Sequence, residues 1–161
     1  MAYPNQKQQK HHTVQEALKK AMAYCAYQDR CHKEVLQKLR NLGQKQTAQD
    51  HILGQLIADG FLNEERFARS FTRGKFNNKQ WGRLRIVREL KARDLSAYNI
   101  KFALAEIEAE YLTHFEKICT KKWEETAHLP LLKRKKKVFD YLNYRGWEPH
   151  LIYEGLNSLE A

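Results

Sequence analysis

The chain has 161 residues and a formal net charge of +10, with only 7 Gly and 3 Pro. It contains no run of about 18 apolar residues and no charged-then-apolar leader, so neither a membrane span nor a secretory signal is predicted. The positive charge steers association with polyanions and therefore favours nucleic acid or an acidic protein surface as the partner. We expect a cytoplasmic protein that does not enter a membrane.

Cysteine and histidine spacing predicts no disulfide and no metal site. Cys25, Cys31 and Cys119 are an odd number and lack the paired spacing of a disulfide framework or a zinc knuckle, so a reducing cytosol is the simpler interpretation. No histidine lies at ligand spacing from a cysteine or carboxylate. Because no phosphate-binding glycine loop is present either, we expect no catalytic residue, no metal and no cofactor.

Residues 1–12 are polar throughout and lack periodic apolar positions, which predicts a disordered basic tail. Apolar residues then recur at three- and four-residue steps, and they predict an amphipathic helix over 13–28. Thr13 and Glu16 have the spacing of a capping box at its start.

Two further helices are predicted before residue 61. The first covers 33–42 and ends at Gly43, which can adopt the left-handed conformation that helix ends favour. The second opens at Thr47 and stops at Gly60. Its expected buried stripe consists of Ile52, Leu53, Leu56 and Ile57.

The middle of the chain begins with a strong helix-start signal. Asn63 is a good N-cap, followed by Glu64 and Glu65 in the first turn, and Phe67 and Phe71 are expected to face the core.

Residues 73–81 are basic and polar, which predicts a linker before a helix that begins near Gly82. Ser96 caps the next helix. The apolar positions of that helix are Ile100, Leu104 and Ile107.

The last third of the chain contains three predicted helices. Residues 110–126 form the first, and Pro130 is expected at the first position of the second. Gly146 ends the second helix, and Pro149 opens the third.

One phrase recurs three times along the chain. Aligning Leu39, Leu90 and Leu142 superposes three similar segments, each followed by a second apolar anchor. These anchors are Ile52 and Leu56, Ile100 and Leu104, and Ile152 and Leu156. A spacing of roughly 50 residues suits a unit of three short helices that packs on its neighbours. Good helix formers are abundant and strand signals are absent, so we predict an all-α, elongated array of three tandem three-helix units over 13–60, 61–109 and 110–161.

The chain resembles the RecX family of recombinase regulators in one combination of phrases: Gly60-Phe61-Leu62-Asn63-Glu64-Glu65-Arg66-Phe67-Ala68, then Gly82, Arg85-Ile86 and Glu89-Leu90. An earlier phrase matches as well, at Glu34, Lys38-Leu39 and Gly43. The similarity covers about residues 24–108 well and 131–159 more loosely. The chain departs from the family pattern at Ala92-Arg93-Asp94-Leu95, where the family has Lys-Gly-Ile after Glu-Leu, and at Cys31-His32, where it often has Ser-Arg.

The resemblance implies a monomeric regulator of homologous recombination, DNA repair and the SOS response. Such a protein binds the filament of RecA recombinase on single-stranded DNA, contacts the DNA phosphates, and suppresses ATP hydrolysis and strand exchange. At Asp94 the resemblance implies a turn that this residue adopts less comfortably than glycine.

Two groups of basic residues are candidates for filament or DNA binding. Arg73, Lys75 and Lys79 accompany polar side chains that can hydrogen-bond phosphates, namely Asn77, Asn78 and Gln80. Five like charges at Lys133, Arg134, Lys135, Lys136 and Lys137 should repel one another unless phosphates or carboxylates neutralise them. The alternative for this second group is a solvated basic face.

On the helix after Gly82, Arg85 and Arg88 lie nearly opposite an apolar side formed by Leu84, Ile86, Val87 and Leu90. They are therefore available to a partner, or they only solvate the outer face. Arg83 falls within the apolar sector, which favours a structural role.

Six aromatic side chains lie at positions that favour core packing: Phe67, Phe71, Phe102, Phe139, Tyr141 and Trp147. Stacking on bases is an alternative for Phe76 and Trp81, which sit between charges.

Two other functions remain open. Three short helices per unit can mimic a helix-turn-helix, which would make the chain a stand-alone DNA-binding module. A basic face could also make it a scaffold that docks an acidic protein. Of these three functions, only that of a filament regulator requires RecA for tight binding.

Overall fold

The computed structural model describes residues 11–161, and within them it contains nine α-helices, one short 3-10 helix and no strand. The all-α prediction is therefore confirmed. The backbone contacts divide the chain into two compact units, one up to Phe67 and one from Ala68 to Ala161. No helix in the described range is long and apolar enough to cross a membrane. Residues 1–10 of the tail predicted over 1–12 lie outside the described residues, whereas the His12 carbonyl accepts from Gln44 Nε2 at 2.7 Å. The division into three units in an elongated array stays a prediction.

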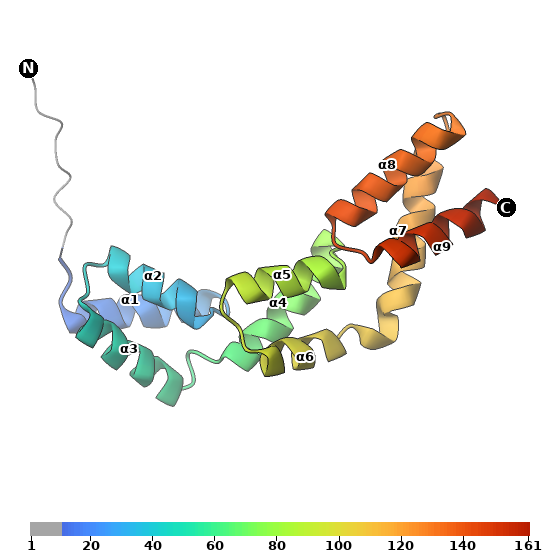
Figure 1. The fold of residues 1–161 in the computed structure, drawn as a ribbon. Coiled ribbons are helices and arrows are strands. Elements are labelled where there is room, and N and C mark those ends of the chain that lie inside the picture. Colours follow the sequence, from blue (N-terminus) through green and yellow to red (C-terminus); the bar gives the residue numbers. More distant parts are fainter. Residues whose placement is uncertain (1–10) are drawn as a thin grey trace, which may run out of the picture. The chain divides into compact units, whose positions relative to one another are not determined.

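The first unit contains three helices and the start of a fourth: α1 (Val14–Tyr27), α2 (His32–Asn41), α3 (Gln46–Ala58) and α4 (Glu64–Lys79) (Figure 1). Helices α1 to α3 pack around a buried core of Ala17, Ala21, Cys25, Val35, Leu39, Leu42, Ile52, Leu56 and Leu62. The capping box is confirmed, because the Glu16 amide donates to Thr13 Oγ1 and the Thr13 amide donates to Glu16 Oε2.

Two details of α3 differ from the prediction. The helix begins at Gln46 with Lys45 as its N-cap, so Thr47 lies inside the first turn and does not cap it. Ile57 is 45% exposed, whereas Leu56 is fully buried. Consecutive helical residues point about 100° apart, so Leu56 and Ile57 face different directions. The buried side of α3 is therefore narrower than the four apolar residues suggested.

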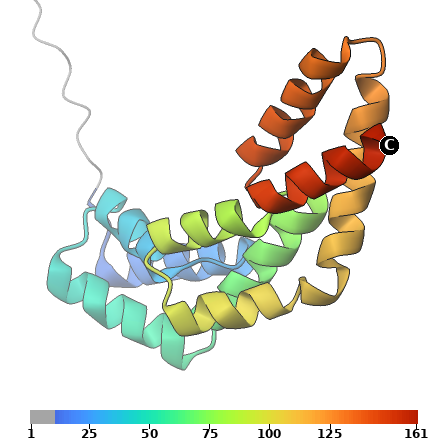
Figure 2. The same cartoon turned by 45° about the vertical axis from the view of Figure 1, so that its right-hand side comes forward.

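The second unit contains the rest of α4, then α5 (Arg83–Ala92), α6 (Ala97–Ala105), η1 (Glu108–Glu110), α7 (Tyr111–Glu125), α8 (Leu131–Tyr144) and α9 (Pro149–Glu160). Figure 2 shows α8 and α9 lying against α7, and contacts join all three pairs of these helices. Ser96 caps α6 and Pro149 opens α9, both as predicted. Pro130 is the N-cap of α8 and not its first residue, so that prediction was wrong by one position.

The same turn ends α2, α5 and α8. In each case the second residue after the helix has a positive φ: Gly43 at 76°, Asp94 at 59° and Gly146 at 87°. The amide of the following residue donates to the carbonyl of an aligned leucine: Gln44 to Leu39 at 3.1 Å, Leu95 to Leu90 at 3.2 Å, and Trp147 to Leu142 at 3.2 Å. This bonding is the Schellman motif, and it occurs in the same register in the three aligned phrases. Asp94 occupies the left-handed position that glycine holds in the other two.

The predicted linker over 73–81 was wrong, because α4 continues without interruption to Lys79. Thr72 and Phe76 are almost completely buried and extend the inner face of the helix beyond Ala68. A glycine inside a helix, such as Gly74, costs only about 1 kcal/mol relative to alanine, and tertiary burial offsets that cost.

An aromatic cluster forms the centre of the second unit. It consists of Phe76, Tyr111, His114, Phe115 and Trp147, with ring centroids 4.2 Å apart for Phe76 and His114 and 4.7 Å apart for Tyr111 and Trp147. Trp147 is fully buried and Phe76 is 1% exposed. The core position of Trp147 is confirmed. Because Phe76 is buried as well, its ring is not available to stack on a base.

One aromatic residue that was predicted to be buried is exposed. Phe102 was expected in the core but is 38% exposed, and its ring packs against Tyr98 at 4.5 Å on the outer side of α6. The buried side of α6 is supplied by Ile100 and Ala103.

Candidate nucleic-acid interface

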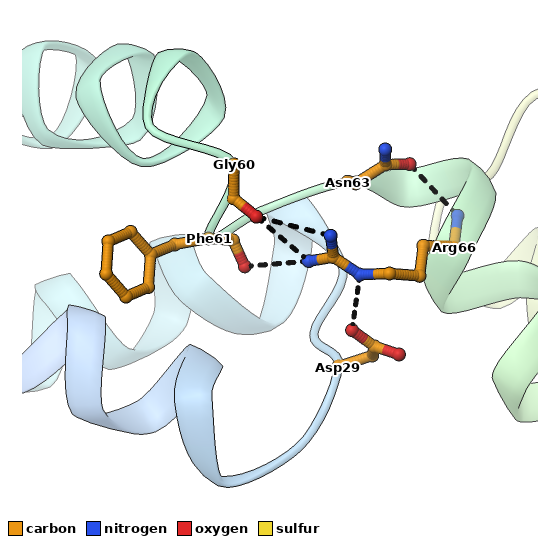
Figure 3. A network of polar contacts seen from close by, with 5 residues as sticks. All are labelled: Asp29, Gly60, Phe61, Asn63 and Arg66. Carbon is orange, nitrogen blue, oxygen red and sulfur yellow. Dashed lines mark hydrogen bonds and ion pairs between the residues drawn. The ribbon is translucent and has the colours of Figure 1, made fainter.

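The phrase that carries the family resemblance is held together by Arg66 (Figure 3). Its guanidinium donates to the carbonyls of Gly60 and Phe61 at 3.2 Å, and its Nε donates to Asp29 Oδ1 at 2.8 Å. Asn63 accepts from the Arg66 amide at 2.9 Å, as expected for an N-cap. These bonds fix the connection between α3 and α4 to the turn after α1. The residues of this phrase therefore have a structural role.

The predicted basic residues of α4 have different environments. Arg73 pairs with Glu106 at 3.1 Å. The Lys75 ammonium lies 5.0 Å from the Trp81 ring centroid in a cation–π contact. Lys79 is exposed and forms no ion pair with any residue that the structure describes.

Arg85 is not free, contrary to the prediction. It is half-buried, its guanidinium lies 4.1 Å from the Trp81 ring centroid, and one terminal nitrogen donates to the Tyr144 carbonyl at 3.3 Å. Trp81 is half-buried and carries both this arginine and Lys75 on its ring, which argues against base stacking. Arg88 is exposed and has no ion pair within the described part of the chain.

The inner side of α5 is narrower than predicted. Ile86 and Leu90 are fully buried, but Leu84 is 50% exposed. The α8–α9 turn covers the start of α5 on the side of Arg85, and this contact could not be seen in the helix's own sequence.

The structural role of Arg83 is confirmed. Its Nε lies 3.0 Å from Glu148 Oε1, a terminal nitrogen lies 3.4 Å from Glu108, and the guanidinium lies 3.9 Å from the Tyr111 ring centroid. The Tyr111 hydroxyl accepts from the Arg83 amide at 2.8 Å and donates to Glu148 Oε2 at 2.7 Å. Burial raises the pKa of Tyr111, so the phenol keeps the proton that it donates.

The basic run on α8 is divided among several roles. Arg134 donates to the Trp123 carbonyl at 3.0 and 2.6 Å and covers the Trp123 ring at 3.7 Å, so it holds α8 to α7.

The lysines of the run differ from one another. Lys135 pairs with Glu160, and Lys136 pairs with Asp140. Lys137 and Lys133 are exposed and form no ion pair with a described residue. The five-charge run therefore presents two unpaired cations, because the fold supplies acids and an aromatic ring to the others.

Four cations, one of them Lys79, gather where the sequence did not predict a site. A hollow of about 290 Å³ lies among the end of α4, α7 and the end of α8. Its charged and aromatic wall consists of Lys79, Lys121, Lys122, Glu125, Tyr141 and Arg145. Of the predicted binding residues only Lys79 lines it. Lys121, Lys122 and Arg145 could not be found from spacing, since they come from α7 and the end of α8 and meet Lys79 only because α4 extends beyond residue 73.

A larger hollow of about 550 Å³ runs between α7 and α9 and is lined in part by Phe115, Cys119 and Gly155. Burial raises the pKa of the Cys119 thiol to about 11, which leaves it protonated and unreactive at neutral pH. Cys25 and Cys31 are likewise buried. Among residues 11–161 no three His, Cys, Asp or Glu side chains are grouped to hold a metal ion.

The sequence is similar to one protein family. Residues 63–104 match the family model described as the second three-helix domain of RecX. The chain is 29% identical over 145 residues to Regulatory protein RecX of Lactobacillus gasseri, covering 89% of this chain and 54% of that protein. It is 28% identical over 132 residues to Regulatory protein RecX of Pseudomonas entomophila, covering 82% and 84%. The chain spans about half the length of the Lactobacillus relative and of a Bacillus cytotoxicus relative, of which it covers 55%.

Solved structures have the same fold. A RecX crystal structure from Lactobacillus salivarius superposes with a TM-score of 0.77 at 22% identity, over 91% of this chain and 96% of that one. A second structure of a regulatory protein RecX superposes with a TM-score of 0.73 at 21% identity, over 90% and 73%.

Proposed function

We propose that the chain, which is similar to RecX proteins in sequence and in fold, regulates homologous recombination and DNA repair by binding the RecA filament on single-stranded DNA. Binding is through contacts with the filament protein and with DNA phosphates together. The chain acts as a monomer in the cytoplasm and has no catalytic activity of its own.

The observation that supports this proposal is the set of exposed basic side chains without ion pairs in the described residues. Four of the predicted binding residues belong to this set: Lys79, Arg88, Lys133 and Lys137. In a chain with a net charge of +10, such side chains are available to phosphates or to acidic protein groups without first breaking an internal bond. Arg73, Lys75, Arg85, Arg134, Lys135 and Lys136 remain candidates for contacts that compete with their present partners.

The regulatory effect is most simply inhibition. A protein that binds one filament state better than another shifts the filament towards that state by its difference in affinity. Preference for a filament that does not turn over ATP lowers both ATP hydrolysis and strand exchange.

The test is the rate of ATP hydrolysis by RecA on single-stranded DNA, measured while the chain is added. We expect the rate to fall, and we expect Lys133→Gln/Lys137→Gln to need roughly 10-fold more protein for the same effect, because two phosphate contacts are lost. Lys19→Gln/Lys20→Gln removes the same charge from the exposed side of α1 and should inhibit as well as the unmodified chain.

No change in RecA turnover at saturating chain would reject the proposal. If inhibition is normal in both variants, Lys133 and Lys137 only solvate α8.

A further inference from the structure

We propose that the hollow lined by Lys79, Lys121, Lys122 and Arg145 is a site for one phosphodiester of single-stranded DNA. It lies within the second unit, where the end of α4 meets α7 and the end of α8. The first and the last of these residues, Lys79 and Arg145, are more than 60 positions apart in the sequence.

Charge in the hollow is unbalanced. Glu125 is the one carboxylate among the residues of its wall, and it pairs with Lys122 at 3.2 Å. Lys79 and Lys121 are exposed and pair with no acid among residues 11–161. The buried Nε of Arg145 has no hydrogen-bond acceptor in the same range. An anion that enters the hollow would meet several donors and little repulsion, and charge-assisted hydrogen bonds are about twice as strong as neutral ones.

The lining favours a phosphate group over a base. The ring of Tyr141 is the aromatic surface of the hollow, and it already carries the Arg145 guanidinium at 3.9 Å and the Lys122 ammonium at 4.5 Å. A base therefore has no free ring to stack on, whereas phosphate oxygens can accept from these cations. Asn78 and Gln80 add amide donors at the rim, so the contact would not depend on DNA sequence.

Backbone strain is located at the same place. Gln80 has a φ of 58°, a left-handed conformation that a residue other than glycine adopts at a cost in free energy. Its carbonyl accepts from Trp147 Nε1 at 3.0 Å, and the Trp81 amide donates to the Lys75 carbonyl at 3.1 Å. These bonds fix the end of α4 in the position that brings Lys79 beside α7 and α8.

The site deepens the proposed function and rests on it for its ligand, because the strand inside a RecA filament offers phosphodiesters. A single phosphate contact gives weak binding to bare DNA, which agrees with a regulator that needs the filament for tight binding.

The experiment is titration of a fluorescent oligothymidylate with the full chain, followed by anisotropy at several salt concentrations. We expect Lys79→Gln/Lys121→Gln to bind roughly 10-fold more weakly and to lower the log–log salt slope by about 0.7, the value for one phosphate of a single strand. Lys19→Gln/Lys20→Gln is the control for removal of the same charge and should bind as the unmodified chain does. Inorganic phosphate at matched ionic strength should displace the oligonucleotide by less than about twofold.

Equal weakening in both double variants would show diffuse attraction and overturn the site. So would unchanged binding in Lys79→Gln/Lys121→Gln, absence of oligonucleotide binding by the unmodified chain, or strong competition by inorganic phosphate, which would indicate a site for a small anion. The two proposals fail separately. Hollow-dependent DNA binding without any effect on RecA turnover would reject the filament function alone, and inhibition of RecA by a chain that ignores the oligonucleotide would reject the hollow alone.

Discussion

Gly82 and Gly146 are in direct backbone contact in the second unit, and neither has room for a side chain. A Cβ atom on Gly82 would lie 2.5 Å from the Gly146 carbonyl oxygen, and one on Gly146 would overlap the backbone of Arg85. The Gly82 amide donates to the Arg145 carbonyl at 2.8 Å, and the Leu84 amide donates to the Gly146 carbonyl at 3.0 Å. The α8–α9 turn thus accepts amides at the start of α5 that have no partner inside that helix.

This contact predicts that Gly146→Ala destabilises the second unit by about 2–4 kcal/mol, through the strained φ of 87° and the clash with Arg85. Urea unfolding followed by circular dichroism measures the change. Gly74→Ala is the matched control, because a Cβ there meets nothing within 4 Å. That substitution should stabilise α4 by about 0.5–1 kcal/mol. A neutral Gly146→Ala would mean that the two glycines do not touch in solution.

The register of the repeated phrase predicts opposite outcomes for two leucines of α5. Leu90 is fully buried, so Leu90→Ala should lower the free energy of unfolding by about 2–5 kcal/mol. Leu84 is 50% exposed, and Leu84→Ala should cost less than about 1 kcal/mol. If the two substitutions lowered the free energy of unfolding equally in chemical denaturation, α5 would have to be rotated about its axis relative to this structure.

The stability of the second unit should depend on pH through His114. Burial beside Phe76 lowers the pKa of this histidine below its ordinary value of 6.5, and Lys117 lowers it further, while a hydrogen bond with the Phe76 backbone and the charge of Glu110 act in the opposite direction. The unfolded chain therefore binds a proton more readily, so stability is fully present above about pH 6.5 and is lost as the pH falls towards the folded value.

The midpoint of urea unfolding, measured from pH 7.5 down to about pH 5, reports this dependence. His114→Gln should flatten the curve over that window. His128→Gln, at an exposed position after α7, should leave it as it is. If the urea midpoint of His114→Gln changed with pH as steeply as that of the unmodified chain, other groups would be responsible for the pH dependence.

Arg66 predicts a difference between arginine and lysine in the first unit. Its fork donates to two carbonyls and to Asp29, and a lysine ammonium cannot make the same set of bonds. Since the side chain is 45% exposed, Arg66→Lys should cost only about 1 kcal/mol, measured by thermal unfolding. Arg40→Lys, at an exposed position on α2, is the control and should not change the midpoint. Equal midpoints for the two variants would contradict the bonds of Figure 3.

Helix ends were the most predictable part of the fold, because they depend on local chemistry. Asn63 and Ser96 cap their helices, and Gly43 and Gly146 adopt positive φ, since few residue types serve these positions well. The length of α4 could not be predicted in the same way. Its second half is helical because Phe76 packs against rings from α7 and from the α8–α9 turn, and no local pattern contains that information.

Candidate binding residues were only partly predictable. Charge identifies which side chains are cationic, but the fold decides which of them already have a partner. Arg85 and Arg134 looked exposed on their own helices and instead cover Tyr144 and Trp123. The basic hollow was not predicted because its wall is assembled from α4, α7 and α8, and each helix contributes only one or two of its cations.

The proposed function requires that the chain recognises an assembled filament and not DNA alone. Cosedimentation with RecA filaments on single-stranded DNA, compared with the same DNA without RecA at roughly 150 mM salt, tests it directly. We predict that the chain sediments with the filament at concentrations at least about 100-fold below those needed for bare DNA, whose non-specific affinity at this salt is on the order of 10⁻⁴ to 10⁻⁶ M. Equal binding to filament and bare DNA would contradict the account and would make the chain a stand-alone DNA-binding module.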